Sequence, residues 1–225
     1  MARFDDKQII ASWEKNVAPW VQAVRRGEIR SRVQVTDSAI VEAVLHRNPG
    51  TILDLGCGEG WLCRALGRHG VETLGIDVVP DLIAAAEKAG TGRFMTMAYE
   101  AVSPDSIPDR FDAVICNFSL LGEASVEHLF QQIPGLLTAG GALIVQTLHP
   151  ESACAEAEYR DGWRAGSWAG FGDAFVEPAP WYFRTLESWK ALFGANGLRL
   201  VDTVEPINPD TGGYASVIFV GEVSR

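Results

Sequence analysis

Residues 54–60, which read Asp-Leu-Gly-Cys-Gly-Glu-Gly, constrain the fold of this chain more than any other segment. They overlap the end of an apolar run at residues 51–55 and precede a segment with helical spacing at residues 61–69. Glycines between a strand and a helix permit a tight turn, and they let a ligand approach the backbone closely. The helix that follows adds amide donors at its N-terminus. The segment therefore predicts a strand–turn–helix unit that binds a nucleoside.

Two carboxylates flank this turn. Asp77 ends the next apolar run, residues 72–77, at the expected spacing of about 20 residues from the glycines, where it can accept hydrogen bonds from both ribose hydroxyls. Asp54 lies just before the turn, where a carboxylate disfavours pyrophosphate but suits a ligand that carries an ammonium and a sulfonium. The glycines are spaced Gly-x-Gly-x-Gly and are followed by Trp61, whereas dinucleotide sites usually show Gly-x-Gly-x-x-Gly.

The order of apolar and amphipathic segments predicts an α/β fold. After a helix at residues 37–47, strand and helix signals alternate, which indicates a parallel sheet. The last two strands, residues 198–205 and 214–222, are joined by a connection too short for a crossover helix, so we expect an antiparallel hairpin. The fold class predicted is a doubly wound, mostly parallel, seven-stranded sheet with an antiparallel last strand.

Two segments stand outside this alternation. Residues 1–35 are expected to form a helical lid, with a helix at residues 8–28 that Pro19 breaks or kinks. Residues 149–184 are rich in Trp, Phe, Tyr, Gly and Pro, and they are too long for a plain connection. We expect this aromatic insertion to cover a substrate site within the main domain, residues 36–225.

Composition excludes several classes of function. The formal net charge of −10 disfavours broad binding to nucleic acid. The four cysteines form no Cys-x-x-Cys pair and have no zinc spacing with histidine, so no metal site is predicted. This cysteine usage, together with the lack of a signal peptide or of a run long enough to span a membrane, predicts a cytoplasmic protein. The oligomeric state stays open.

Taken together, these motifs resemble class I S-adenosylmethionine-dependent methyltransferases. The resemblance is to the small-molecule group that includes ubiquinone-biosynthesis enzymes and methyltransferases of types 11 and 12. Residues 54–60 are similar to the first motif of that family, residues 111–116 to its fourth strand, and residues 137–145 to its helix–turn–fifth-strand signature. The resemblance covers about residues 36–222, and it implies a Rossmann-like fold, S-adenosylmethionine as the cofactor and a small-molecule substrate.

The same resemblance implies which residues bind the cofactor. Gly56 and Gly58 match the backbone platform under the methionine part. Arg32 matches an arginine that holds the cofactor's carboxylate, with Arg30 as the alternative. Further contacts are implied at the turn and at three strand ends, namely Asp54, Cys57, Asp77, Val78, Tyr99, Glu100, Asn117 and Phe118.

Catalytic candidates come from the region after the fifth strand. His149 follows that strand at the carboxyl edge of the sheet, where it is a candidate general base. The alternative is a histidine that is hydrogen-bonded at a strand end before Pro150. Tyr182 and Arg184 border the aromatic insertion, where they orient a substrate or pack as part of a lid. The insertion favours a small acceptor that is apolar or aromatic.

Three other functions are left open. A nicotinamide-dependent oxidoreductase would need the dinucleotide glycine spacing and an all-parallel sheet. A non-catalytic protein with a methyltransferase-like fold would bind the cofactor without turnover. A nucleic-acid methyltransferase would need a basic face, or an Asn/Asp-Pro-Pro-aromatic motif where this chain has Asn-Phe-Ser-Leu at residues 117–120.

Overall fold

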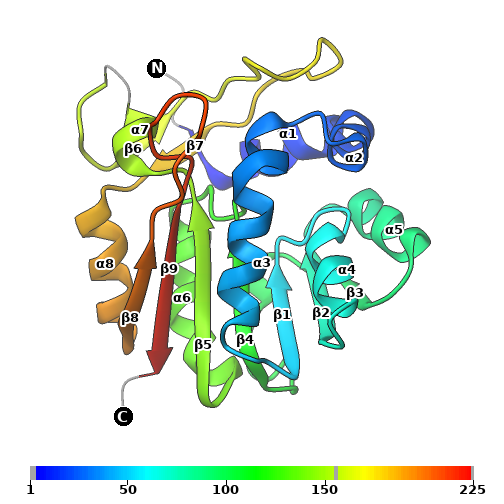
Figure 1. Ribbon diagram of the computed structural model, residues 1–225, viewed down its shortest axis with the longest axis vertical. Helices are drawn as coiled ribbons and strands as arrows, with labels where there is room; N and C mark the ends of the chain where they lie inside the picture. Colours follow the sequence, from blue (N-terminus) through cyan, green and yellow to red (C-terminus); the bar gives the residue numbers. More distant parts are fainter. Residues whose placement is uncertain (1–3, 155–156, 224–225) are drawn as a thin grey trace.

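The computed structural model describes residues 4–154 and 157–223, and its centre is a seven-stranded sheet (Figure 1). The strand order is β3-β2-β1-β4-β5-β9-β8, so the predicted α/β class and strand number are confirmed. The first three residues of the expected lid and residues 155–156 of the expected insertion lie outside the described residues. The strands of this sheet are β1 (Thr51–Leu55), β2 (Glu72–Asp77), β3 (Arg93–Thr96), β4 (Phe111–Asn117), β5 (Leu137–Thr147), β8 (Leu198–Val204) and β9 (Val217–Val223).

The last strand runs against the rest of the sheet. β9 pairs antiparallel with β5, with Ile144 opposite Val220, and β8 pairs antiparallel with β9. The predicted terminal hairpin is therefore confirmed, while β1 to β5 pair in parallel. Because parallel strands share a direction, the carboxyl ends of β1, β2 and β4 meet at one edge, which is the upper edge in Figure 1.

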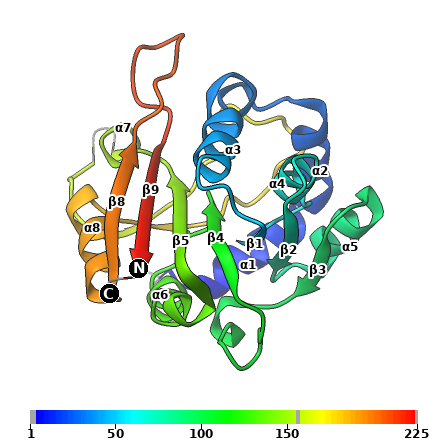
Figure 2. The same ribbon diagram turned by 60° about the horizontal axis from the view of Figure 1, so that its bottom comes forward.

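Both faces of the sheet are covered by helices (Figure 2). Side chains alternate along β1, so Ile52 packs on one face and Leu53 and Leu55 pack on the other, and all three are fully buried. The Ile52 face carries α3 (Asp37–Leu45) and α4 (Trp61–Gly67), whereas the opposite face carries α6 (Ala124–Leu136) and α8 (Leu186–Ala195). α5 (Pro80–Ala89) packs against β2 and β3, with Pro80 at its first turn.

The N-terminal region forms two helices, α1 (Asp6–Lys15) and α2 (Val17–Arg26). The expected break at Pro19 is wrong, because the chain breaks at Asn16 instead. The side chain of Asn16 donates to the backbone carbonyl of Ser12, so that this carbonyl in the last turn of α1 is satisfied by a side chain. Pro19 lies in the first turn of α2, where its missing N–H costs no hydrogen bond.

The aromatic insertion crosses the same edge of the sheet as α1 and α2 (Figure 1). It contains α7 (Pro150–Cys154) and a two-stranded antiparallel sheet of β6 (Gly162–Arg164) and β7 (Trp181–Phe183). Two short irregular helical turns also occur, a π-helical turn η1 (Arg32–Thr36) and a 3₁₀ turn η2 (Tyr99–Ala101). Within the described part of the chain, we find no helix with the length and apolar character needed to cross a bilayer.

Candidate functional site

A cavity of about 430 Å³ opens above the carboxyl ends of β1, β2 and β4. It brings together most of the residues that the sequence predicted. Only Asp54 and His149 of that set do not line it. The predicted residues in its wall are Arg32, Gly56, Cys57, Gly58, Asp77, Val78, Tyr99, Glu100, Asn117, Phe118 and Tyr182.

The glycine turn forms the floor of this cavity. The backbone N–H groups of Gly56 and Cys57 both donate to the carbonyl of Ile76, at 2.8 and 2.9 Å, which fixes the turn on β2. Gly56 has a φ of +78°, and a Cβ there would lie 2.4 Å from the Cβ of Ser119. A side chain is therefore excluded at Gly56 both by backbone conformation and by space.

Asp77 is held in place by the same turn. Its Oδ2 accepts the N–H of Gly58 and its Oδ1 accepts the N–H of Val79, both at 2.9 Å. Burial raises the pKa of this carboxyl, and the backbone hydrogen bonds oppose that rise. Each oxygen of a carboxylate can accept more than one hydrogen bond, so Asp77 keeps acceptor sites for a ligand's hydroxyls.

Asp54 lies beneath the turn and is 2% exposed. The thiol of Cys63 donates to its Oδ2 at 3.6 Å, while its Oδ1 has no hydrogen-bond partner among the described residues. Burial raises the pKa of this carboxyl to about 7, and the nearby charge of Asp77 adds to the rise. Asp54 is therefore close to half ionised at neutral pH, and a positive charge nearby would favour its ionised form.

The π-helical turn η1 contributes two polar side chains, Arg32 and Thr36, to the cavity wall. Arg32 donates from Nε to Asp37 at 2.9 Å, and its guanidinium lies 4.7 Å above the ring of Trp61. Neither Nη2 of Arg32 nor the hydroxyl of Thr36 has a partner among the residues that the structure describes. Arg30 is exposed and pairs with Asp210 instead, so of the two arginines it is Arg32 that faces the cavity.

The end of β4 contributes the third side of the site. The side-chain oxygen of Asn117 is buried and has no partner in the described chain. Phe118 adopts a φ of +53° while its N–H donates to the carbonyl of Gln146 at 2.8 Å. A left-handed backbone at a bulky residue costs about 1–3 kcal/mol, and such strain is concentrated at functional sites.

The unpartnered atoms complement the two ends of an amino acid. The guanidinium of Arg32 and the hydroxyl of Thr36 can donate to a carboxylate, whereas the oxygens of Asn117 and Asp54 can accept from an ammonium. Leaving a buried polar atom unpaired costs about 1–3 kcal/mol, so a ligand that pairs these atoms recovers that cost. Together with Asp77, they suit a ligand that has both a ribose and an amino-acid end.

The remaining predicted cofactor residues support the turn or form the rim. Tyr99 donates from its hydroxyl to the carbonyl of Leu55 at 3.1 Å, directly under Gly56. The thiol of Cys57 packs with Cys63 and Ile83, and burial raises its pKa. Val78 and Glu100 line the cavity edge. That these side chains contact an adenine stays a prediction.

His149 does not line the cavity, although it follows β5 as expected. Its Nδ1 accepts the N–H of Glu151 at 3.3 Å, so its Nε2 can donate to Glu205 at 3.2 Å. The ring is 1% exposed and stacks on Tyr214 with 4.0 Å between centroids. These contacts favour the alternative left open by the sequence, a histidine held at a strand end.

Tyr182 and Arg184 border the cavity from β7 and the segment after it. Burial, together with the charge of Glu123, raises the pKa of the Tyr182 phenol, so Tyr182 stays protonated at neutral pH. Arg184 is buried and donates to the carbonyls of Gly122 and Glu123, at 2.8 and 3.2 Å. Tyr182 therefore presents a neutral hydroxyl beside Glu123 at the cavity border, and Arg184 fixes the loop before α6.

The roof of the cavity is aromatic, and sequence reasoning identified only part of it. Trp168 and Phe171 come from the insertion, whereas Trp13 and Trp20 come from α1 and α2. The ring centroids of Trp13 lie 4.9 Å from those of Trp20 and 5.7 Å from those of Trp168. The sequence alone places Trp13 and Trp20 in the helix expected at residues 8–28, and nothing local in it brings that helix next to residue 168.

Comparisons with known proteins match this chain to one family model and to curated relatives. A family model described as a methyltransferase domain matches residues 28–203. The ubiquinone biosynthesis O-methyltransferase of Methylococcus capsulatus is 34% identical over 101 residues, which is 43% of each chain. The chain thus matches less than half the length of that curated relative.

Solved structures share the fold at low sequence identity. Magnesium protoporphyrin IX methyltransferase from Synechocystis PCC 6803, with bound S-adenosylhomocysteine (SAH), has a TM-score of 0.70 and 19% identity, covering 98% of this chain and 100% of that one. A protein from Listeria monocytogenes described as a putative S-adenosylmethionine-dependent methyltransferase has a TM-score of 0.67 and 20% identity. The match covers 84% of this chain and 99% of that one.

Proposed function

The chain belongs to the methyltransferase domain family, and from this premise we propose that it transfers a methyl group from S-adenosylmethionine to a small molecule. The observation that carries the proposal is the set of unpartnered polar atoms of Arg32, Thr36 and Asn117 in the wall of one cavity, together with the unpartnered oxygen of Asp54 beneath its floor. They complement an amino-acid carboxylate and ammonium, and Asp77 adds acceptors for ribose hydroxyls. NAD has no amino-acid end, so it would leave those atoms unpaired.

The residues of this chain would hold the cofactor at three points. We place the carboxylate at Arg32 and Thr36, the ammonium at Asn117 and Asp54, and the ribose at Asp77. The bound cofactor would supply a methyl group activated by a sulfonium: an acceptor atom would bond to the methyl carbon in line with the carbon–sulfur bond, and the sulfur would leave as the thioether of S-adenosylhomocysteine. The protein's part is to align the two reactants and to exclude water.

We propose an acceptor that is apolar or aromatic. Apolar side chains of α1 and of the insertion also line the cavity, including Ile9, Ile10, Trp13, Trp168 and Trp181. Such a lining favours an apolar ligand whose few polar groups each form a hydrogen bond with a polar side chain in the wall. The protonated Tyr182 phenol is one such side chain.

Residues 1–35 and 149–184 are proposed to form the lid over this site. Asn16 is fully buried and exchanges two hydrogen bonds with Val176, donating to its carbonyl at 2.7 Å and accepting its N–H at 2.9 Å. Ser12 donates to the carbonyl of Glu177 at 2.6 Å, and Lys15 forms an ion pair with the side chain of Glu177. These contacts join the two segments, so we expect them to open together.

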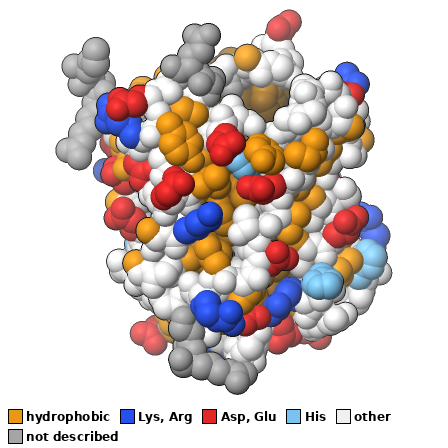
Figure 3. All heavy atoms as spheres, turned by 60° about the vertical axis from the view of Figure 1, so that its left-hand side comes forward, with side chains coloured by type: hydrophobic (Ala, Val, Ile, Leu, Met, Phe, Trp, Pro, Cys, Tyr) orange, Lys and Arg blue, Asp and Glu red, His pale blue; other side chains and the backbone are white. Residues whose placement is uncertain are grey.

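A small molecule suits the surface better than nucleic acid does. The net charge is −10, and Figure 3 shows Lys and Arg side chains scattered among acidic and hydrophobic ones on the face that carries α8 and β8. Binding to a phosphate backbone depends on a cluster of cations. The four free, buried cysteines suit a reducing compartment, so we also propose a cytoplasmic location.

Separate calorimetric titrations with SAH and with NAD test the proposed function. We expect SAH to bind with a micromolar Kd and NAD to show no binding at millimolar concentration. Incubation with methyl-labelled cofactor and a metabolite extract then tests turnover. Tight SAH binding without any labelled product would favour the non-catalytic alternative, and NAD binding without SAH binding would favour the oxidoreductase.

We expect replacement of His149 by alanine to reduce stability and to leave SAH affinity within twofold of the wild type. The ring fills a buried site and makes two hydrogen bonds, so its loss should cost about 2–3 kcal/mol of unfolding free energy. Thermal unfolding measures this, with the exposed His69→Ala as control. Loss of labelled product at unchanged stability would instead identify His149 as the general base.

A further inference from the structure

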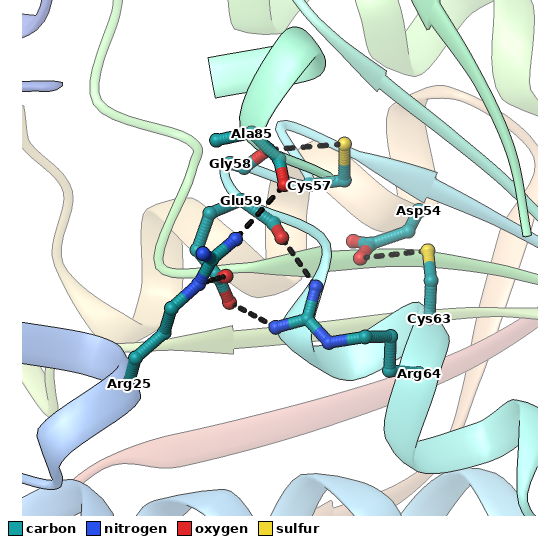
Figure 4. A network of polar contacts seen from close by, with 8 residues as sticks. All are labelled: Arg25, Asp54, Cys57, Gly58, Glu59, Cys63, Arg64 and Ala85. Carbon is teal, nitrogen blue, oxygen red and sulfur yellow. Dashed lines mark hydrogen bonds and ion pairs between the residues drawn. The ribbon is translucent and has the colours of Figure 1, made fainter. Parts of the chain in front are cut away.

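A charge network around one buried carboxylate joins α2 to the glycine turn (Figure 4), and its Arg25 side chain is 40% exposed. Glu59 lies within the turn, and its side chain is fully buried. Arg25, from α2, donates to its Oε2 at 2.7 Å, and Arg64, from α4, donates to its Oε1 at 2.6 Å. A buried carboxylate is tolerated when cations and hydrogen bonds compensate for its lost hydration, so both arginines stabilise this position of Glu59.

The two arginines differ in what they connect. Arg64 also donates to the backbone carbonyl of Glu59, so it keeps the turn on the helix that follows it. Arg25 reaches across from the N-terminal region and donates from Nη2 to the carbonyl of Ala85 in α5, at 2.8 Å. Arg25 therefore ties α2 to two elements of the sheet domain at once.

The segment that Arg25 ties down carries part of the cavity wall. Trp20 lies on the same helix, and a Cβ at Gly58 would be 3.5 Å from its indole nitrogen. Arg32 follows α2 within one short turn, and its guanidinium lies 5.7 Å from the ring of Trp20. Movement of α2 away from Glu59 would displace both side chains from the cavity.

We propose that Arg25 is a positioning residue: through Glu59 it holds α2, and with it Trp20 and Arg32, in the place that cofactor binding requires. This inference rests on the proposed function, because it concerns the affinity of the same site. The adjacent Arg26 provides a matched control, since it is 66% exposed and its one ion pair with a described residue is to Glu28, at 3.8 Å.

Calorimetry with SAH compares Arg25→Gln with Arg26→Gln. We expect Arg25→Gln to raise the Kd about tenfold and Arg26→Gln to change it less than twofold. Arg25→Lys should recover part of the loss, because an ammonium restores the ion pair but cannot reach Glu59 and Ala85 in the same fork geometry. Equal effects of the two glutamine variants, or no effect of Arg25→Gln, would overturn the proposal.

Two further measurements separate positioning from general destabilisation. Limited proteolysis should cleave Arg25→Gln near Gly27 faster than the wild type, while thermal unfolding of the sheet domain changes little. In the Glu59→Ala background, Arg25→Gln should weaken SAH binding by less than threefold, because Arg25 then keeps only its hydrogen bond to the carbonyl of Ala85. A full tenfold effect in that background would contradict a route through Glu59. Absence of SAH binding to the wild type would refute the proposed function instead.

Discussion

Replacement of Asp77 by alanine is expected to weaken SAH binding about 100-fold. The carboxylate is the acceptor we assign to two ribose hydroxyls, and hydrogen bonds to a charged group contribute about 1.5–3 kcal/mol each. A loss of about 3 kcal/mol corresponds to about two decades in Kd. The same substitution leaves the N–H groups of Gly58 and Val79 without their acceptor, so the turn also loses one of its links to β2, while the bonds of Gly56 and Cys57 to the carbonyl of Ile76 remain.

Two variants make this result specific. Asp77→Asn keeps one oxygen acceptor and should fall between the wild type and Asp77→Ala. Asp81 is an exposed carboxylate in the first turn of α5, so Asp81→Ala should leave the SAH affinity within twofold. Calorimetry gives each Kd, and thermal unfolding confirms that the variants are folded. An Asp77→Ala protein that binds SAH as tightly as the wild type would disprove the assigned ribose contact.

The parts of the site that are local in sequence could be predicted. Residues 54–60 and Asp77 follow from strand ends, glycine conformations and spacing, because these features act over a few residues. The terminal hairpin is predicted for the same reason, since its short connection allows no crossover helix.

The parts that depend on distant contacts could not be predicted. The partners of His149 are Glu205 and Tyr214, which come from a different strand connection, so its environment is set by tertiary packing. Thr36 directly precedes the helix expected at residues 37–47, yet its hydroxyl does not cap that helix, because the π-helical turn places Thr36 in the cavity wall. The N-terminal helix was expected to break at Pro19 but ends at Asn16. The Asn16 side chain is held there by hydrogen bonds to the backbone of Val176, which is distant in the sequence.

Glu59 illustrates a middle case. Its position inside the glycine motif was visible in the sequence. The glycines alone account for the turn, however, so the sequence offered no reason to assign a role to Glu59. Only the structure shows that its carboxylate is fully buried between arginines from two helices. A charged residue within an otherwise small-residue turn is the signal that could have pointed to a partner elsewhere in the chain.

The affinity for SAH is expected to rise about tenfold between pH 6 and pH 8. In the free protein the pKa of Asp54 is about 7, above its ordinary value of 3.8, because the carboxyl is buried. A ligand ammonium beside it favours the ionised form, so the complex binds fewer protons than the free protein does. By linkage, affinity increases with pH up to the free-state pKa and then levels off.

The same shift has the opposite sign for stability. Because the folded pKa is above the unfolded one, the contribution of Asp54 to the unfolding free energy is fully present below about pH 4. It is lost as the pH rises toward 7. Binding and stability should therefore change in opposite directions with pH over the upper part of this range, which a general effect of pH on the fold would not produce.

Asp54→Asn and 5′-methylthioadenosine are the two controls for this pH dependence. The amide cannot ionise, so the variant should bind SAH with an affinity that changes less than twofold between pH 6 and pH 8. The nucleoside analogue lacks the amino-acid end, so the wild type should bind it without the rise. Calorimetry at pH 7 in buffers of different ionisation enthalpy should show about half a proton released with SAH and none with the analogue. Equal pH profiles for the two ligands would rule out the placement of the ammonium beside Asp54.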